Sequence, residues 1–265
     1  MHIDRTRARE AFYAYVRDYD AQNPRIALKI DHTLRVASLC ERIARSQGEA
    51  NPCLAGEDVD LAWLCGLLHD IGRFEQVRRF GTFNDATSVS HATLGAEVLF
   101  GGADPRGPRI RTYVNSSEED DLLRTAVATH SDYRLPTDLD ERTRVFCDIL
   151  RDADKIDILA VNCLCPIEDI YGVSEHDMRT SKLSPAVVKT FYEHRTIPRD
   201  IRQYPADILV GHICFAWELV YDESRTIARE QGYLDRMLSR TFLDAETQRT
   251  FAQMATHMRN HLQRG

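Results

Sequence analysis

The sequence lacks long apolar segments and any regular cysteine pattern. No stretch approaches the roughly 18 uninterrupted apolar residues of a membrane span, and the charged segment 1–19 lacks the apolar region of a secretion signal. The seven cysteines form no CxxC pairs, and an odd count at irregular spacing disfavours a disulfide framework. These absences predict a cytoplasmic protein with reduced thiols and no association with a membrane.

Linkers and excess positive charge are also lacking. No Gly/Ser-rich, Pro-rich or single-charge tract divides the 265 residues, so we expect a single domain, 1–265, with one long surface loop at 100–117. The net charge is −7 at pH 7, whereas binding to a nucleic-acid backbone normally requires a basic surface. We therefore expect no nucleic-acid backbone as a partner, although local Arg and Lys leave room for a small anionic substrate.

Apolar residues recur at three- and four-residue intervals, and runs of alternating polarity long enough for a sheet are lacking. This pattern predicts an all-α fold. The expected helices cover residues 6–19, 26–46, 58–70, 88–100, 118–131, 141–161, 184–194, 204–230 and 244–262.

The predicted helix 58–70 is the most informative of these. Its segment from Leu61 to Leu68 is apolar on every side, which is typical of a helix in the centre of a domain. The helix ends in His69 and Asp70, and an unpaired carboxylate in such a setting is costly. Either a cation bound by both side chains compensates Asp70, or Asp70 caps a helix or pairs with Arg73.

Four further candidate ligands lie on mainly apolar helix faces, namely His32, His91, His130 and Asp154. Gly95, one turn after His91, leaves room there for a close neighbour. A single inward histidine is more often a hydrogen-bonded core residue than a ligand, and we interpret His212, within an apolar segment, as such a core residue. Four inward histidines together with two inward carboxylates favour a metal site.

The order His32, His69-Asp70, His91, His130, Asp154 resembles the HD superfamily of metal-dependent phosphohydrolases in its six-ligand, binuclear form. The stretch HDIGR at 69–73 is similar to the HDxGK/R motif, RDADKID at 151–157 is similar to the closing Asp motif, and TFNDATSVSHA at 82–92 resembles a group of bacterial HD hydrolases. The resemblance implies an HD helical bundle at about 20–175. We interpret the remainder, about 176–265, as a C-terminal helical extension that forms a cap or a homodimer surface.

The resemblance further implies two divalent transition-metal ions per chain. One ion has the ligands His32, His69, Asp70 and Asp154, and the other has Asp70, His91 and His130. Imidazole and carboxylate ligands suit iron, manganese, cobalt, nickel or zinc. Asp70 would be catalytic as well as ligating, because two ions that share it activate a hydroxide. Cys65, about one turn before His69, is expected to pack in the core.

A phosphorylated substrate also needs a cation from the protein. Arg73 is the first candidate for catalysis and substrate binding, because its planar guanidinium can bind two phosphoryl oxygens, and the resemblance points to the same residue. Lys155, in the closing Asp motif, is a second candidate for both roles, although a helical Lys is usually solvated. Lys29, one turn before the first histidine, is a candidate for substrate binding. Asp85 and Ser90 are weaker candidates.

We predict hydrolysis of a phosphomonoester or phosphodiester, in a nucleotide-like small molecule, by a metal-activated hydroxide. Two alternatives stay open. One is an HD-type oxygenase with a mixed-valent di-iron centre, because some HD proteins with a similar six-ligand set contain such a centre. The other is a non-catalytic HD module that senses a nucleotide, which a missing ligand would favour; all six are present.

Overall fold

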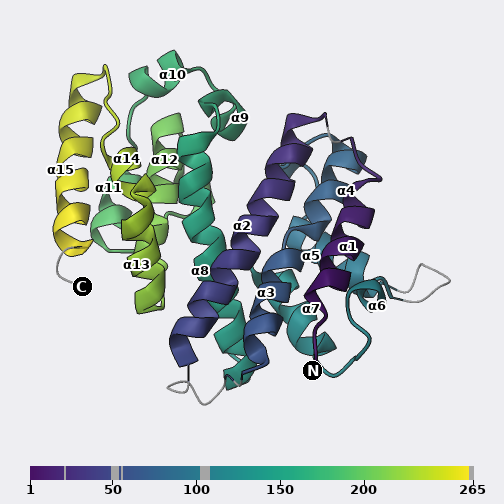
Figure 1. Cartoon of the computed structure of the whole chain (residues 1–265). Helices are drawn as coiled ribbons and strands as arrows, with labels where there is room; N and C mark the ends of the chain where they lie inside the picture. The colour runs from purple at the N-terminus through teal and green to yellow at the C-terminus, as the bar shows by residue number, and fades with distance from the viewer. Residues whose placement is uncertain (21, 49–53, 55, 102–107, 263–265) are drawn as a thin grey trace. The chain divides into compact units, whose positions relative to one another are not determined.

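The computed structural model of the chain describes residues 1–20, 22–48, 54, 56–101 and 108–262. Every regular element within these ranges is helical, which confirms the all-α prediction (Figure 1). Within the same ranges, no helix is both long and apolar enough to cross a membrane. The chain divides into two compact units, an N-terminal unit (Met1–Asp154) and a C-terminal unit (Lys155–Gly265).

The described part of the N-terminal unit consists of α-helices and the short 3-10 turn η2. Its elements are α1 (Arg5–Val16), α2 (Pro24–Gln47), α3 (Asp58–Leu68), α4 (Ile71–Phe80), η2 (Asp85–Thr87), α5 (His91–Phe100), α6 (Ile110–Tyr113), α7 (Asp120–Thr129) and the larger part of α8 (Glu141–Leu164). Helix α3 packs against α1, α2 and α7, and its residues from Leu61 to Leu68 are all buried. The predicted central helix is therefore confirmed.

Local sequence explains where several of these helices begin and end. The Asn23 side chain accepts a hydrogen bond from the Arg25 amide, and Pro24 occupies the first turn of α2, where no intrahelical donor is lost. Ser90 caps α5 by accepting from the Thr93 amide. Helix α4 ends at Gly81, whose φ of 66° lies in the left-handed region that glycine adopts without strain.

A glycine contact joins α4 to α5. A Cβ atom added to Gly72 would lie 2.2 Å from the His91 carbonyl oxygen and 2.5 Å from the Gly95 amide nitrogen. The two backbones therefore touch directly. The room predicted beside Gly95 is occupied by Gly72 and Ile71 at the start of α4.

The C-terminal unit has its own apolar core. Its elements after α8 are α9 (Ile167–Tyr171), α10 (Glu175–Thr180), α11 (Pro185–Tyr192), η3 (Arg199–Ile201), α12 (Pro205–Ile213), η4 (Cys214–Glu218), α13 (Asp222–Gln231), α14 (Tyr233–Leu238) and α15 (Ala245–Leu262). Buried side chains such as Met178, Phe191 and Phe251 form this core.

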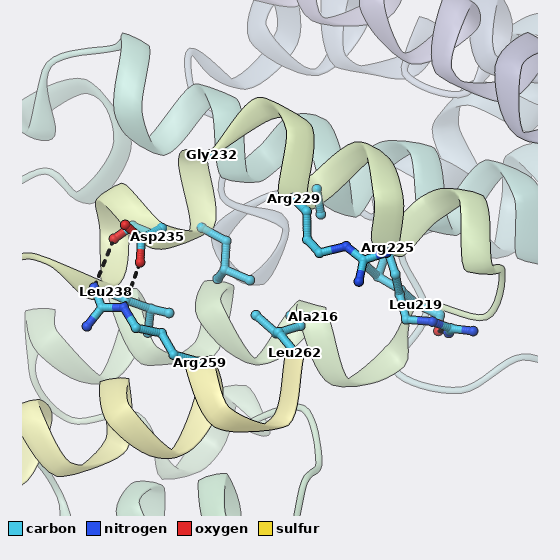
Figure 2. Close-up of a pocket in the computed structure, with 11 residues that line it drawn as sticks. Ala216, Leu219, Arg225, Arg229, Gly232, Asp235, Leu238, Arg259 and Leu262 are labelled. Carbon is cyan, nitrogen blue, oxygen red and sulfur yellow. Dashed lines mark hydrogen bonds and ion pairs between the residues drawn. The ribbon is translucent and has the colours of Figure 1, made fainter. Parts of the chain in front are cut away.

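Figure 2 shows a cavity of about 150 Å³ in the C-terminal unit. Its wall is mostly apolar, with Leu234 and Leu262 among the lining residues, and Arg225, Arg229 and Arg259 add cationic groups. None of the side chains predicted to bind metal or substrate lines this cavity.

Several predicted helix assignments are wrong, and the short helices α9, α10 and α14 were not predicted. The segment after Asp70 begins a separate helix, α4, that we did not predict. The predicted helix 204–230 is interrupted, since α12 passes into the 3-10 turn η4 and α13 starts only at Asp222. The predicted surface loop at 100–117 contains α6, while its residues 102–107 lie outside the described residues. The prediction of a single domain with an HD core ending near 175 stays a prediction. The division into two compact units does not show whether either unit is a separate domain.

Candidate metal centre

Six predicted ligands from different helices meet in the N-terminal unit. Four of them lie at helix ends: His69 directly after α3, Asp70 directly before α4, His91 at the start of α5 and His130 directly after α7. His32 and Asp154 lie within α2 and α8. The four histidines and Asp70 are buried, so the helices gather their polar groups inside an otherwise apolar bundle.

Asp70 lies between two pairs of histidines. Its Oδ2 is 3.4 Å from His32 Nε2 and 3.5 Å from His69 Nε2. Its Oδ1 is 3.4 Å from His91 Nε2 and 3.7 Å from His130 Nε2. Each carboxylate oxygen thus faces a different pair. Two groups with the spacing of metal ligands result, and they share Asp70.

Asp154 extends the first of these groups. Its Oδ1 lies 3.2 Å from His32 Nε2 and 3.8 Å from His69 Nε2. The first group therefore contains two imidazoles and two carboxylates, and the second contains two imidazoles and the shared Asp70. This division is the one that the HD resemblance implies.

The ring nitrogens that face away from the centre are anchored. His69 Nδ1 lies 2.7 Å from the Gly66 carbonyl oxygen, and His130 Nδ1 lies 2.7 Å from that of Val127. A carbonyl oxygen only accepts, so Nδ1 is the donor in both rings. The unprotonated Nε2 atoms of these two rings then point inward, where His69 Nε2 lies 3.2 Å from His32 Nε2 and His130 Nε2 lies 3.0 Å from His91 Nε2.

Asp85 anchors a third ring, that of His91, with its Oδ2 2.7 Å from Nδ1. Burial alone would raise the pKa of Asp85, but the hydrogen bond from His91 and the charge of Arg73 lower it. Asp85 stays ionised and orients a predicted ligand, as carboxylates behind metal-bound histidines commonly do. Asp85, one of our weaker candidates, is therefore placed to orient the ring of His91.

Burial and neighbouring charges set the ionisation of the central groups. Burial, followed by the charge of Arg73, lowers the pKa of His91 to about 3, and burial also lowers the pKa of His69. Burial alone would raise the pKa of Asp70, but Lys29 and His69 lower it well below its usual range. The centre therefore combines neutral imidazoles with an ionised carboxylate, which are the forms that bind cations.

Two of the predicted cationic residues contact this centre. Lys29 Nζ lies 2.6 Å from Asp70 Oδ2. Arg73 Nη1 donates to Asp85 Oδ1 at 2.9 Å and to the Phe83 carbonyl at 2.6 Å. Arg73 Nε is buried, has no hydrogen-bond acceptor among the described residues and lies 3.6 Å from Asp70 Oδ1. Part of the guanidinium is thus fixed by the protein, while a buried donor next to Asp70 stays available.

The third predicted cation, Lys155, is the first residue of the C-terminal unit. Its Nζ forms an ion pair with Glu218 at 3.0 Å. Successive residues on a helix point about 100° apart, so proximity to Asp154 in sequence does not bring the two side chains to the same point.

Two buried polar residues escaped our sequence analysis. Gln76 Nε2 donates to Asp85 Oδ1 and to the Val89 carbonyl, both at 2.9 Å, and so fixes the segment before α5. Arg151 Nη1 donates to the His130 carbonyl at 3.0 Å and holds the end of α7. Only their positions in the sequence could have indicated these two residues. Gln76 follows Arg73 by about one helical turn, and Arg151 is the first residue of the RDADKID stretch.

The remaining candidates have structural partners. Ser90 caps α5. Cys65 is buried, and burial raises the pKa of its thiol, in agreement with a packing role. His212 belongs to the C-terminal unit, where its Nδ1 lies 3.1 Å from Asn162 Oδ1.

The comparison with protein families agrees with this geometry. The family model of the HD domain matches residues 30–161, a range that includes all six side chains of the centre. No curated protein and no solved structure matches the chain.

Proposed function

We propose that this chain, which belongs to the HD domain family, is a metal-dependent phosphohydrolase that cleaves a phosphomonoester or phosphodiester of a nucleotide-like small molecule. The observation that carries the proposal is the position of Asp70. Its two oxygens face two separate pairs of histidine nitrogens, at 3.4–3.7 Å. A carboxylate in that position suits a pair of cations better than a single one.

The donor set fits divalent transition-metal ions. His32, His69, Asp70 and Asp154 would hold one ion, and Asp70, His91 and His130 the other. Imidazole and carboxylate without thiolate suit iron, manganese, cobalt, nickel or zinc. When bound, such a pair lowers the pKa of a water molecule and neutralises charge on a phosphoryl oxygen.

The protein contributes the orientation of the donors and the local charge. The Nδ1 anchors of His69 and His130 keep both Nε2 lone pairs directed at Asp70. Lys29 keeps Asp70 ionised through their contact of 2.6 Å. A site organised in this way needs little rearrangement when charge develops on a substrate.

Arg73 is the cation that we assign to the phosphoryl group. Its Nη1 is held by Asp85 and Phe83, which fixes the plane of the guanidinium. Its buried Nε lacks an acceptor among the described residues, and a phosphoryl oxygen beside Asp70 would satisfy it. Lys29 is a second substrate-binding candidate. For Lys155 to act there, its ammonium would have to leave Glu218.

The test begins with elemental analysis of protein purified without chelators. A panel of phosphomonoesters and phosphodiesters is then assayed with each metal found, under strictly anaerobic conditions. We expect metal-dependent release of phosphate or nucleotide from at least one compound, because hydrolysis needs no oxidant. The test variant is D70N, which should lose activity. The matched control is D31N, which should keep activity because Asp31 is an exposed carboxylate on α2.

A different outcome would overturn the assignment. Two irons with a mixed-valent paramagnetic signal, no turnover of any phosphoester and O₂ consumption with an organic substrate would identify an oxygenase instead.

A further inference from the structure

Three histidines gather around Trp217 in the C-terminal unit, outside the range of the HD match. His194 lies two residues after α11, Trp217 lies in η4, and His257 and His261 lie in α15. Segments separated by more than 60 positions along the chain therefore contribute imidazoles to one place.

Two of the imidazoles are already close enough to share a ligand. His194 Nε2 lies 2.8 Å from His257 Nε2. The corresponding separations in the HD centre are 3.2 Å for His32 and His69 and 3.0 Å for His91 and His130. The Nε2 atoms of this exposed pair are thus as close to each other as those of the two buried pairs in the HD centre.

Trp217 fixes the ring of His194. The two rings are stacked with centroids 4.1 Å apart and planes 12° from parallel. The backbone of His194 has a φ of 55°, which places it in the left-handed region where glycine or asparagine commonly ends a helix. An imidazole at this position is held in one orientation by the stacking contact.

His261 supplies a third imidazole. It follows His257 by four residues on α15, and residues at this spacing lie on one helix face. The centroid of its ring is 5.0 Å from that of His194 and 4.7 Å from that of Trp217. The three imidazoles do not have metal-ligand spacing in this structure, so His261, which is exposed near the end of α15, would have to rotate about its side-chain bonds to bring a nitrogen to the other two.

We propose that His194, His257 and His261 form a second transition-metal site, separate from the HD centre. Three imidazoles and an exposed open position suit Zn²⁺, Ni²⁺ or Cu²⁺. A bound ion would link the segment after α11 to α15, and it would stabilise the C-terminal unit because it binds only the folded arrangement.

The first experiment counts zinc ions per full-length chain after equilibrium dialysis against Zn²⁺, with the HD centre intact. H257Q and H194N remove one ligand each, and asparagine tolerates the positive φ of residue 194. H176Q is the matched control, since His176 is an exposed histidine on α10. We expect H257Q and H194N to bind one ion fewer than the wild-type protein and H176Q.

Affinity for this one ion should fall by more than about 100-fold in H257Q, since even an outer-shell partner of a metal ligand is worth roughly 10–100-fold. Equal zinc stoichiometry and affinity in the wild-type protein, H257Q and H194N would overturn the proposal. That result would identify the His194–His257 contact as a hydrogen bond between two imidazoles.

The second experiment places the ion. The chain has two tryptophans, and Trp217 contacts the proposed ligands whereas Trp63 belongs to α3. Ni²⁺ should quench part of the tryptophan emission of the wild-type protein and H176Q. That part should be absent in W217F and H257Q. Quenching of the same size in H257Q would place the ion elsewhere and overturn the proposal.

Discussion

At the scale of single residues, Asp70 connects the two halves of the metal centre through its two oxygens. D70N keeps the shape of the side chain but removes its charge, so we expect the metal content to fall and turnover to drop by at least about 100-fold. These magnitudes follow from the loss of a ligand that the two proposed ions would share. Elemental analysis and a phosphoester assay measure them, and circular dichroism should report an unchanged helical protein.

The control for this prediction is D31N, which changes an exposed carboxylate adjacent to His32 in sequence. Its metal content and activity should equal those of the wild-type protein. A D70N protein with full metal content and full activity would remove Asp70 from the centre.

Asp85 is expected to act as a positioning residue. D85N weakens the contact to His91 Nδ1 and leaves Arg73 Nη1 without a carboxylate. The affinity for one ion should fall by about 10–100-fold, which is typical for an outer-shell partner, while the ion at His32 and His69 stays bound. Metal titration that follows the two ions separately checks this difference. Equal weakening of both ions would contradict a role through His91.

His212 should make stability depend on pH. Burial, followed by the charges of Arg202 and Arg199, lowers its pKa to about 3 in the folded protein. Below the ordinary value near 6.5, the unfolded chain takes up a proton that the folded chain does not, so the free energy of unfolding falls as pH falls from about 6.5 toward 3. Between pH 7 and pH 5 this loss amounts to about 1–2 kcal/mol.

Denaturant unfolding of the wild-type protein and H212Q at several pH values measures this contribution. The wild-type protein should lose more stability than H212Q as pH falls, and H212Q should keep its metal content. H176Q, which changes an exposed histidine in the same unit, should follow the wild-type slope. Identical slopes for the wild-type protein and H212Q would show that His212 takes up its proton in the folded state as easily as in water.

At the scale of helices, the centre depends on the direct contact between α4 and α5. G72A would place a methyl group 2.2 Å from the His91 carbonyl oxygen, so a backbone must shift. We expect a loss of at least about 1–3 kcal/mol in the free energy of unfolding, the usual cost of overpacking, together with weaker binding of the ion at His91 and His130. Denaturant unfolding and metal titration measure both effects.

G56A is the matched control, because a Cβ at Gly56 meets no atom of the described residues within 4 Å. It should leave stability and metal binding close to those of the wild-type protein. If G72A were as stable as G56A, the contact between α4 and α5 would be looser than 2.2 Å implies.

Helix type was predictable from sequence, but several helix breaks were not. A continuous apolar segment identified the central helix α3, because all its faces are buried. It could not identify the break between α12 and α13, where neither glycine nor proline occurs in the segment 212–222. There Arg225 Nη1 donates to the Leu219 carbonyl at 2.6 Å. This hydrogen bond from α13 back to the segment before it stabilises the break, which helix propensity alone does not predict.

At the scale of the whole molecule, the predicted ligands were easier to identify than the groups around them. Ligands within helices share a face with apolar neighbours, so the period of 3.6 residues marked His32 and Asp154. Asp85 lies in an irregular segment, where spacing gives no direction. Lys155 lies beside Asp154 in sequence but forms its ion pair with Glu218 in the C-terminal unit. Contacts between distant segments decide such cases, and no local pattern encodes them.

The anchored histidines also bear on how the protein obtains its ions. Because carbonyl oxygens and Asp85 hold the rings before any cation arrives, loading needs no folding step, and a departing ion leaves a vacancy of the same shape. Metal availability then helps to decide which suitable cation fills it, since selectivity among first-row metals in cells follows geometry, ligand type and availability rather than raw affinity. The metal content of a preparation should therefore record the growth medium and nutritional history of the cells that made it.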